Sequence, residues 1–190
     1  MIKLLKNKQT EKYQELKKLV LSDTFFWHWG QSTDPRQSPV EGHIHMPYYR
    51  HSFLTRPEPM GFTFVESEFT PLNIEVLKEI VEYNQLFDPQ QYFFLRSSAN
   101  CNHAEGGIQF SEPHVDHDFP HWNMIVYLQG DGSTFVEGEE HVPEEDEVIL
   151  FKGEHYMQRP SKGRRLILVS TIYEINNNAS LLNTISIGGN

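Results

Sequence analysis

The sequence predicts a mainly β domain, an antiparallel sandwich or barrel of the jelly-roll or cupin kind, with helices flanking it on the N-terminal side. The second half of the chain, from Tyr92 onward, consists of short apolar segments separated by turn sequences such as GDGS, PEED and PSKG. Aromatic residues make up 13% of the chain, and the 11 prolines and 12 glycines are spread along it. These features are typical of many short strands joined by turns.

The strands of the second half are identified by apolar and β-branched residues. Their spacing resembles that of successive hairpins, so neighbouring strands are expected to run antiparallel. A chain of 190 residues is long enough for one hydrophobic core, and nothing in its composition requires a second domain. We expect residues 1–190 to form a single domain with strands at 92–99, 107–110, 123–129, 133–138, 147–151 and 165–173.

The first half of the chain predicts two helices and several irregular strands. Apolar residues at helical spacing predict an amphipathic helix over residues 3–21. A second helix is expected to begin near Pro71 and Asn73, where a polar cap would precede Ile74, and to end near residues 87–89. Between them, the aromatic runs FFWHW, MPYY and FTFVESEF are interrupted by proline and glycine, which indicates short strands and long loops.

Composition also limits the function classes. The net charge of −10 works against nucleic-acid binding, which draws its affinity from lysine and arginine. The N-terminal segment has no apolar core of signal-peptide length, and no segment reaches the length of a membrane span. The lone cysteine, Cys101, cannot form an internal disulfide, which agrees with a reducing compartment. We therefore expect a soluble, cytoplasmic protein.

The segment EPHVDHDFPHW, residues 112–122, contains the first candidate for a metal site. A mononuclear non-haem iron centre takes two imidazoles and one carboxylate and leaves other positions open. Residues i and i+2 of an extended segment point to the same side, so His114 and Asp116 could supply two ligands. The third ligand must come from another strand.

The His-x-acid triplet carries little weight alone. With 10 histidines and 26 acidic residues, one or two such triplets are expected by chance, and a surface hydrogen bond explains most of them. The second triplet, His103-Ala-Glu105, runs into Gly106-Gly107 and is expected in a loop. His43-Ile-His45 resembles the paired histidines of metal-binding cupins, but MPYYRH, which follows, lacks the further ligands at the required spacing.

Further motifs follow the H-x-D triplet in a fixed order: the strand IVYL, the hairpin GSTF, an acidic turn, the strand EVILF, then His155 and Arg165. His155 stands 39 residues after Asp116, and Arg165 stands ten residues after His155. In this order the segment resembles the catalytic half of the Fe(II)/2-oxoglutarate-dependent dioxygenases, most closely the prolyl-4-hydroxylase-like branch and its small phage and bacterial relatives. The resemblance covers residues 92–174, and residues 1–91 match no family.

The resemblance implies a double-stranded β-helix whose catalytic core is residues 92–174, with residues 1–91 supporting that core and the substrate side. It implies that His114, Asp116 and His155 ligate Fe(II), and that Arg165 grips the distal carboxylate of 2-oxoglutarate through a paired, charge-assisted contact. It also places Tyr127 where a hydroxyl group reaches the same carboxylate. An inward tyrosine of a barrel strand can equally be part of the core.

Several residues compete for these roles. Arg164 adjoins Arg165, and strand alternation sends their side chains to opposite faces, so only one can enter the barrel. The spacing from His155 favours Arg165 and leaves Arg164 as a surface charge. His117 and His121 are expected in an exposed polar loop; alternatively, His121 or the adjacent Trp122 borders the substrate.

A polar face is also predicted on the strand YFFLRSSAN. Arg96, Ser98 and Asn100 alternate along it, so they share one face. This face either meets solvent or lines the pocket, in which case Arg96 and Asn100 are candidates for contacts with co-substrate or substrate.

The activity that the resemblance implies is hydroxylation by Fe(II), 2-oxoglutarate and O2, coupled to decarboxylation of 2-oxoglutarate to succinate and CO2, with ascorbate as a reductant. The carboxylate of Asp116 argues against halogenation, which needs that position for halide. The expected substrate is a peptidyl residue or a small molecule, contacted by segments 25–70 and 117–122. The alternatives are a cupin-type protein that binds a metal or ligand without oxidation, and a structural jelly roll.

Overall fold

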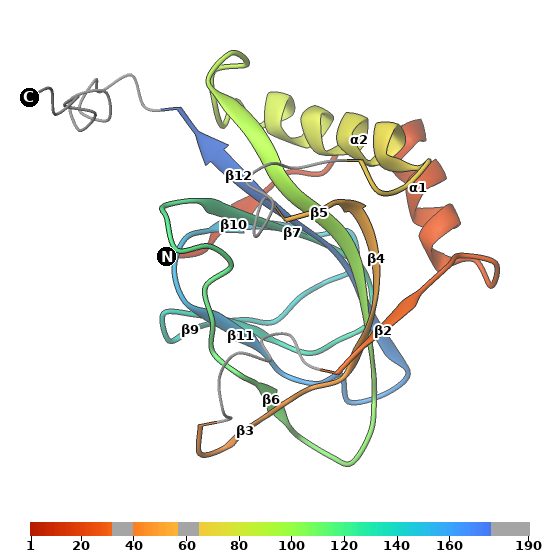
Figure 1. Ribbon diagram of the computed structural model, residues 1–190, viewed down its shortest axis with the longest axis vertical. Coiled ribbons are helices and arrows are strands. Elements are labelled where there is room, and N and C mark those ends of the chain that lie inside the picture. Colours follow the sequence, from red (N-terminus) through yellow and green to blue (C-terminus); the bar gives the residue numbers. More distant parts are fainter. Residues whose placement is uncertain (32–39, 57–64, 176–190) are drawn as a thin grey trace, which may run out of the picture.

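The computed structural model describes residues 1–31, 40–56 and 65–175, which form two β layers and two helices (Figure 1). The larger layer is an antiparallel sheet of seven strands. In spatial order these are β1 (Lys3–Leu5), β10 (Val148–Phe151), β7 (Trp122–Gln129), β12 (Arg164–Glu174), β5 (Tyr92–His103), β4 (Tyr48–Leu54) and β2 (His28–Gly30).

The smaller layer consists of two short sheets. One has the order β11 (His155–Met157), β8 (Thr134–Val136) and β9 (Glu139–His141), and the other pairs β3 (His43–Ile44) with β6 (Phe110–Ser111). Single bridges from Phe110 to Gln158 and from His114 to His155 connect the two. The two layers form a jelly roll of the double-stranded β-helix type, which confirms the predicted fold class.

The two helices, α1 (Glu11–Leu21) and α2 (Thr70–Tyr83), cover one face of the large sheet (Figure 1). Strand alternation divides the sheet residues between two clusters. Met124, Val126 and Leu168 belong to the helix-side core, whereas their neighbours Ile125 and Val169 belong to the cluster on the opposite face. The face away from the helices is therefore available for a site between the two layers. Neither helix of the described ranges is long and apolar enough to cross a membrane.

The expected first helix over residues 3–21 is wrong in its first turns. Lys3–Leu5 instead forms β1, because it pairs with Val148–Leu150 at the edge of the sheet. Gln9 has a positive φ of 51°, which interrupts any helix, and α1 then begins after Thr10, whose hydroxyl caps it by accepting from the Tyr13 N–H.

The second helix and several strands also differ in extent from the prediction. The helix begins at Thr70 and ends at Tyr83, because Gln85 adopts a φ of 50°. Asn73 is not its cap but a buried residue that accepts a hydrogen bond from the Ser97 hydroxyl at 2.7 Å. Of the expected strand 107–110 only Phe110 is in a strand, and β9 and β11 were not predicted. Residues 62–64 of FTFVESEF lie outside the described residues.

Gly130, directly after β7, offers a test of the packing that fixes the start of β12. It has a φ of +91°, and a Cβ there would lie 2.1 Å from the Arg164 carbonyl oxygen. Gly138 has a similar φ of +81° but nothing within 4 Å. Gly130→Ala should therefore lower the free energy of unfolding by about 3–5 kcal/mol, through strain and overpacking together. Gly138→Ala should cost only about 1–2 kcal/mol, from the backbone strain alone.

Urea denaturation of both variants measures this difference. Equal losses of stability for the two substitutions would show that contact with the Arg164 carbonyl is unimportant.

Candidate metal centre

The structure brings His114, Asp116 and His155 together between the two layers. One nitrogen or oxygen from each lies within 4.8 Å of the others, and the His155 Nε2 is 3.6 Å from the Asp116 Oδ2. A pair of backbone hydrogen bonds holds the two histidines in register, from the His114 N–H to the His155 carbonyl at 3.0 Å and in return at 2.9 Å. The three ligand atoms are close enough together for one metal ion to contact all three residues.

Both imidazoles are oriented by their Nδ1 atoms. The His114 Nδ1 bonds to the Glu112 carbonyl at 3.0 Å, and the His155 Nδ1 bonds to the Gly153 carbonyl at 3.3 Å. A ring that donates from Nδ1 presents an unprotonated Nε2, which is the form that binds metals. Burial, together with nearby His114, lowers the pKa of His155 to about 4, so this ring is neutral at pH 7.

Two arginines hold the carboxylate of Asp116. Its Oδ1 accepts hydrogen bonds from Arg56 and from Arg96, each at 2.6 Å, and Arg56 also donates to the Asp116 backbone carbonyl. Burial opposes ionisation of this carboxyl, but the positive charges of Arg96 and Arg56 outweigh it, so the pKa of Asp116 lies below its usual range. The group is a fixed anion.

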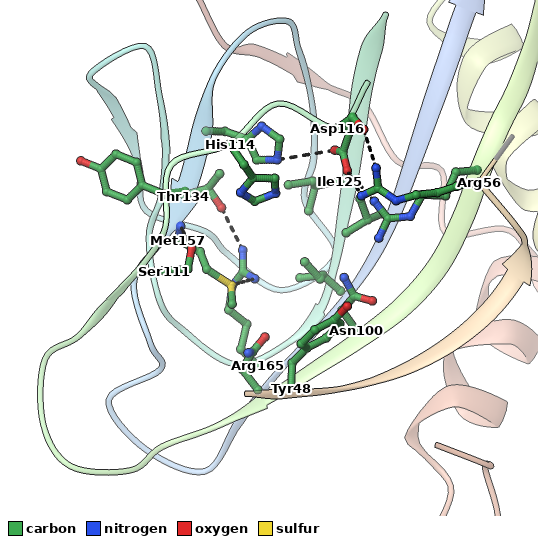
Figure 2. A pocket seen from close by; sticks show the side chains of 16 residues that line it. Tyr48, Arg56, Asn100, Ser111, His114, Asp116, Ile125, Thr134, Met157 and Arg165 are labelled. Carbon is green, nitrogen blue, oxygen red and sulfur yellow. Dashed lines mark hydrogen bonds and ion pairs between the residues drawn. The ribbon is translucent and has the colours of Figure 1, made fainter. Parts of the chain in front are cut away.

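The second oxygen of Asp116 decides whether the residues suit a metal. The Asp116 Oδ2 is buried and accepts no hydrogen bond from any described residue, although a buried carboxylate oxygen normally has a partner. This oxygen lies 3.6 Å from the His155 Nε2. Figure 2 shows the Asp116 carboxylate beside His114. Two imidazoles and one carboxylate are the donor set of a facial 2-His-1-carboxylate Fe(II) site, so these residues fit the ion that the family resemblance implied.

A pocket adjoins the three residues and contains about 590 Å³ of empty space when the part open to solvent is counted (Figure 2). Its floor is apolar and comes from β7 and β12 of the large sheet, and its walls are polar. The lining residues are Tyr48, Arg56, Arg96, Asn100, Asn102, Ser111, His114, Asp116, Ile125, Thr134, His155, Tyr156, Met157, Arg165, Ile167 and Val169.

Arg165 lines this pocket and is 1% exposed. It donates to the Thr134 hydroxyl at 2.8 Å and contacts the Met157 sulfur at 3.1 Å, while its Nε has no partner among the described residues. Burial lowers its pKa, but a guanidinium remains charged at neutral pH. No carboxylate of the described chain pairs with it. A buried cation therefore faces the pocket without a counter-ion.

Tyr127 lies behind Arg165 and not on the pocket wall. Its hydroxyl donates to the Thr134 Oγ1 at 2.7 Å, and the Arg165 guanidinium stands 5.4 Å from its ring. Burial raises the pKa of Tyr127, so its hydroxyl stays protonated. Thr134 lines the pocket and accepts from both neighbours, so its own hydroxyl hydrogen remains available to donate to a ligand.

Arg164 lies on the opposite side of the sheet. Its Nε donates to the Gln129 side chain at 3.1 Å and its guanidinium to the Leu21 carbonyl at 3.3 Å, at the end of α1. The adjacent arginines thus separate as strand alternation predicts. The sequence predicted Arg164 to be a solvated surface charge. Its guanidinium instead binds the Leu21 carbonyl and so ties β12 to the end of α1.

The expected exposure of His117 and His121 is wrong, since only 4% and 6% of these residues is exposed. The loop after Asp116 folds back on β12, so that the His117 Nε2 bonds with the Thr171 hydroxyl at 2.8 Å and its ring stacks on Phe119. Neither His121 nor Trp122 lines the pocket. His45 pairs with the buried carboxylate of Glu112 instead of forming a cupin-like site.

The polar face of β5 lines the pocket, which resolves the alternative that the sequence left open. Arg96 and Asn100 are lining residues, and Asn102 continues the same row. Sequence reasoning missed Arg56 and Thr134. Thr134 could have been found from its place in the GSTF hairpin, but Arg56 reaches Asp116 across 60 residues of sequence and carries no local signal.

Comparison with solved structures identifies proteins of the same fold. A 2OG-Fe(II) oxygenase family protein from Burkholderia pseudomallei matches with a TM-score of 0.57 and 13% identity, over 80% of this chain and 75% of that one. A prolyl hydroxylase from Trichoplax adhaerens, in complex with a hypoxia inducible factor peptide fragment, matches with a TM-score of 0.59 and 13% identity, over 91% and 83%. The chain has the fold of these oxygenases. No protein-family model and no curated protein matches its sequence.

Removal of the carboxylate tests the metal site. Asp116→Ala should weaken Mn(II) or Fe(II) binding by more than about 100-fold, because it removes a charged ligand. It should also lower the free energy of unfolding of the metal-free protein by about 3–5 kcal/mol, because the buried cation of Arg96 loses its partner. Calorimetric titration and urea denaturation measure the two effects.

Asp118→Ala is the matched control, since Asp118 is exposed two residues further along. It should change neither quantity appreciably. Metal affinity in Asp116→Ala equal to that of the control would rule out this metal centre.

Proposed function

We propose that the protein is an Fe(II)- and 2-oxoglutarate-dependent dioxygenase that hydroxylates a peptidyl residue or a small molecule. The observation that carries the proposal is the buried charge of Arg165, which faces the same pocket as His114, Asp116 and His155 and has no acidic partner in the described chain. A metal site and an anion site in one pocket suit a dicarboxylate that binds both.

2-Oxoglutarate has this chemistry: a keto acid at one end that can chelate a metal, and a carboxylate at the other. His114, Asp116 and His155 would hold Fe(II), and Arg165 would bind the distal carboxylate with its paired donors. When bound, Fe(II) with 2-oxoglutarate and O2 supplies the oxidising power for hydroxylation, with succinate and CO2 as by-products.

Thr134, Tyr127 and the apolar floor would orient the co-substrate and exclude water. The Thr134 hydroxyl stands beside Arg165, where it can donate to the same carboxylate, and Tyr127 would act on that carboxylate through its hydrogen bond to Thr134. Ile125, Ile167 and Val169 form the apolar floor. A dry, preorganised site strengthens each of these polar contacts.

A peptidyl substrate is supported by the Trichoplax prolyl hydroxylase of the same fold, which was solved with a peptide fragment. Asp116 is the only acidic residue among the described residues that line the pocket, so a small anionic molecule would meet little repulsion there. The single cysteine, Cys101, is buried and unpaired, which agrees with a reducing cytoplasmic location where Fe(II) persists and where ascorbate could act as reductant.

Turnover of 2-oxoglutarate without substrate tests the activity. Purified protein supplied with Fe(II), ascorbate, O2 and 2-oxoglutarate should release succinate slowly, and His155→Ala should abolish the release because the ion is lost. Mass spectrometry of succinate measures it. Binding of metal and 2-oxoglutarate with no succinate would favour the alternative of a non-oxidative cupin-type binding protein.

Substitution of Arg165 tests whether co-substrate binding can be lost while metal binding is kept. Arg165→Gln should weaken 2-oxoglutarate binding by about 30-fold or more, because a charge-assisted pair is lost, while Mn(II) affinity stays within a few-fold. Calorimetry with Mn(II)-loaded protein measures both affinities.

Arg164→Gln is the control, because it makes the same change of charge on the other face of β12. If Arg164→Gln and not Arg165→Gln impaired 2-oxoglutarate binding, the proposed anion site would be in the wrong place.

A further inference from the structure

Besides the metal centre and Arg165, the pocket has a polar wall formed by β5. Along β5, Arg96, Ser98, Asn100 and Asn102 share one face, and Asn102 pairs with Arg165 in the sheet. Arg96 lies six residues before Asn102 in the same strand. The wall therefore extends about 20 Å from Arg165, where the distal carboxylate of the co-substrate would bind. Figure 2 shows Asn100 and Arg56 on this side, across the pocket from Thr134 and Met157.

The wall presents hydrogen-bond donors. Arg96 donates to the Ser98 hydroxyl at 3.5 Å, and Ser98 donates in turn to the Asn100 Oδ1 at 3.2 Å. This chain fixes the Asn100 amide with its NH2 group turned away from Ser98. Within the described chain the Asn100 Nδ2 has no hydrogen-bond partner, although the residue lines the pocket and is half-buried.

The neighbouring strands add a positive rim and no negative charge. Arg50 of β4 stands opposite Asn100 in the sheet, so its side chain lies on the same face, and it is exposed. On this face β4 contributes Tyr48, Arg50 and Ser52, and β2 contributes His28 opposite Arg50 and Gly30 opposite Tyr48. The described parts of β2, β4 and β5 therefore place no acidic side chain on the pocket face.

The charges of a loaded site do not balance. Fe(II), Arg165 and Arg96 would bring four positive charges, whereas Asp116 and the 2-oxoglutarate dianion would bring three negative ones. Arg56 is left out of this count because it has further contacts. Glu112 is buried but does not line the pocket and pairs with His45. Arg96 and Arg165 are 7% and 1% exposed, and an uncompensated buried charge is costly.

We infer that the substrate carries a carboxylate, which binds at the β5 wall between Asn100 and Arg96, with Arg50 at the rim. The inference rests on the proposed function and narrows its substrate class to organic acids. Such an anion neutralises the excess charge of the loaded site and accepts from the Asn100 amide. A carboxylate can come from a free carboxylic acid or from an acidic side chain of a peptide, and the test separates these sources.

The experiment measures binding of probe compounds to protein loaded with Mn(II) and 2-oxoglutarate, by calorimetry under conditions without turnover. The probes are free amino acids and short monocarboxylic acids, their carboxamides, and terminally blocked tripeptides with central Glu or Gln. Acids should bind about tenfold or more tightly than the matching amides. Binding of the Glu tripeptide without binding of the free acids would identify an acidic peptide side chain as the source.

Asn100→Asp is the decisive variant, because Asn100 contacts neither the metal ligands nor Arg165. Its negative charge should weaken acid binding by about tenfold or more. The same charge should raise the affinity for Mn(II) and lower that for 2-oxoglutarate, so acid binding is measured with both at saturating concentration. Asn100→Leu removes the donor without adding a charge and should weaken acid binding by about three- to tenfold, which keeps the test valid if Asn100→Asp does not fold. Arg164→Gln is the control outside the pocket.

The inference is overturned if amides bind as tightly as acids, if no acid binds, or if the folded Asn100 variants keep the acid affinity of the native protein. Failure of the native protein to bind 2-oxoglutarate would instead refute the proposed function, so the two failures are distinguishable.

Discussion

The double contact of Arg56 and Arg96 with one oxygen of Asp116 determines how the rest of the site is arranged. Both guanidiniums occupy the Oδ1, so the Oδ2 is the oxygen left to face His114 and His155. A carboxylate held in this way is fixed in orientation and in charge before any ion arrives. The cost of holding a buried Arg96 beside a partly buried Arg56 is high, and such a cluster is retained more readily for a function than for stability. The contact also connects the N-terminal half of the chain to the segment that carries Asp116, since Arg56 comes directly after β4.

The large sheet separates two physical environments by strand alternation. One face of β7 and β12 buries Met124, Val126 and Leu168 under the helices, and the other presents Ile125 and Val169 to the pocket. Rigid strands, packed on their dry side, can hold pocket residues to a fraction of an ångström, which loops rarely achieve. The N-terminal helices, although remote from the chemistry, therefore position it. Arg164 contributes to this layer by binding the end of α1, whereas its neighbour Arg165 serves the opposite face.

The parts of the fold that sequence reasoning predicted are those with strong local periodicity. The apolar strands after Tyr92 and the core of each helix were found, and alternation alone separated Arg164 from Arg165. The errors arose where distant partners decide the structure. Lys3–Leu5 has helical-looking spacing but pairs with β10, some 145 residues away in register, and His117 is buried because the loop returns to Thr171. Arg56 could not be assigned to Asp116 from sequence, because nothing near either residue indicates their contact.

The electrostatics of the pocket also depend on which distant residues the fold brings together, and not on the composition of the chain. The net charge of −10 describes the whole surface and suggests that anions are repelled, yet the pocket is lined by three arginines and one aspartate. Local potential depends on buried charges, because solvent screens the exposed acids of the surface far more effectively than it screens a cation in a low-dielectric site. An anion would therefore gain more from Arg165 and the β5 wall than it loses to the distant surface. For this reason the composition, which argues against binding to nucleic acid, does not argue against a small dianion or an organic acid in the pocket.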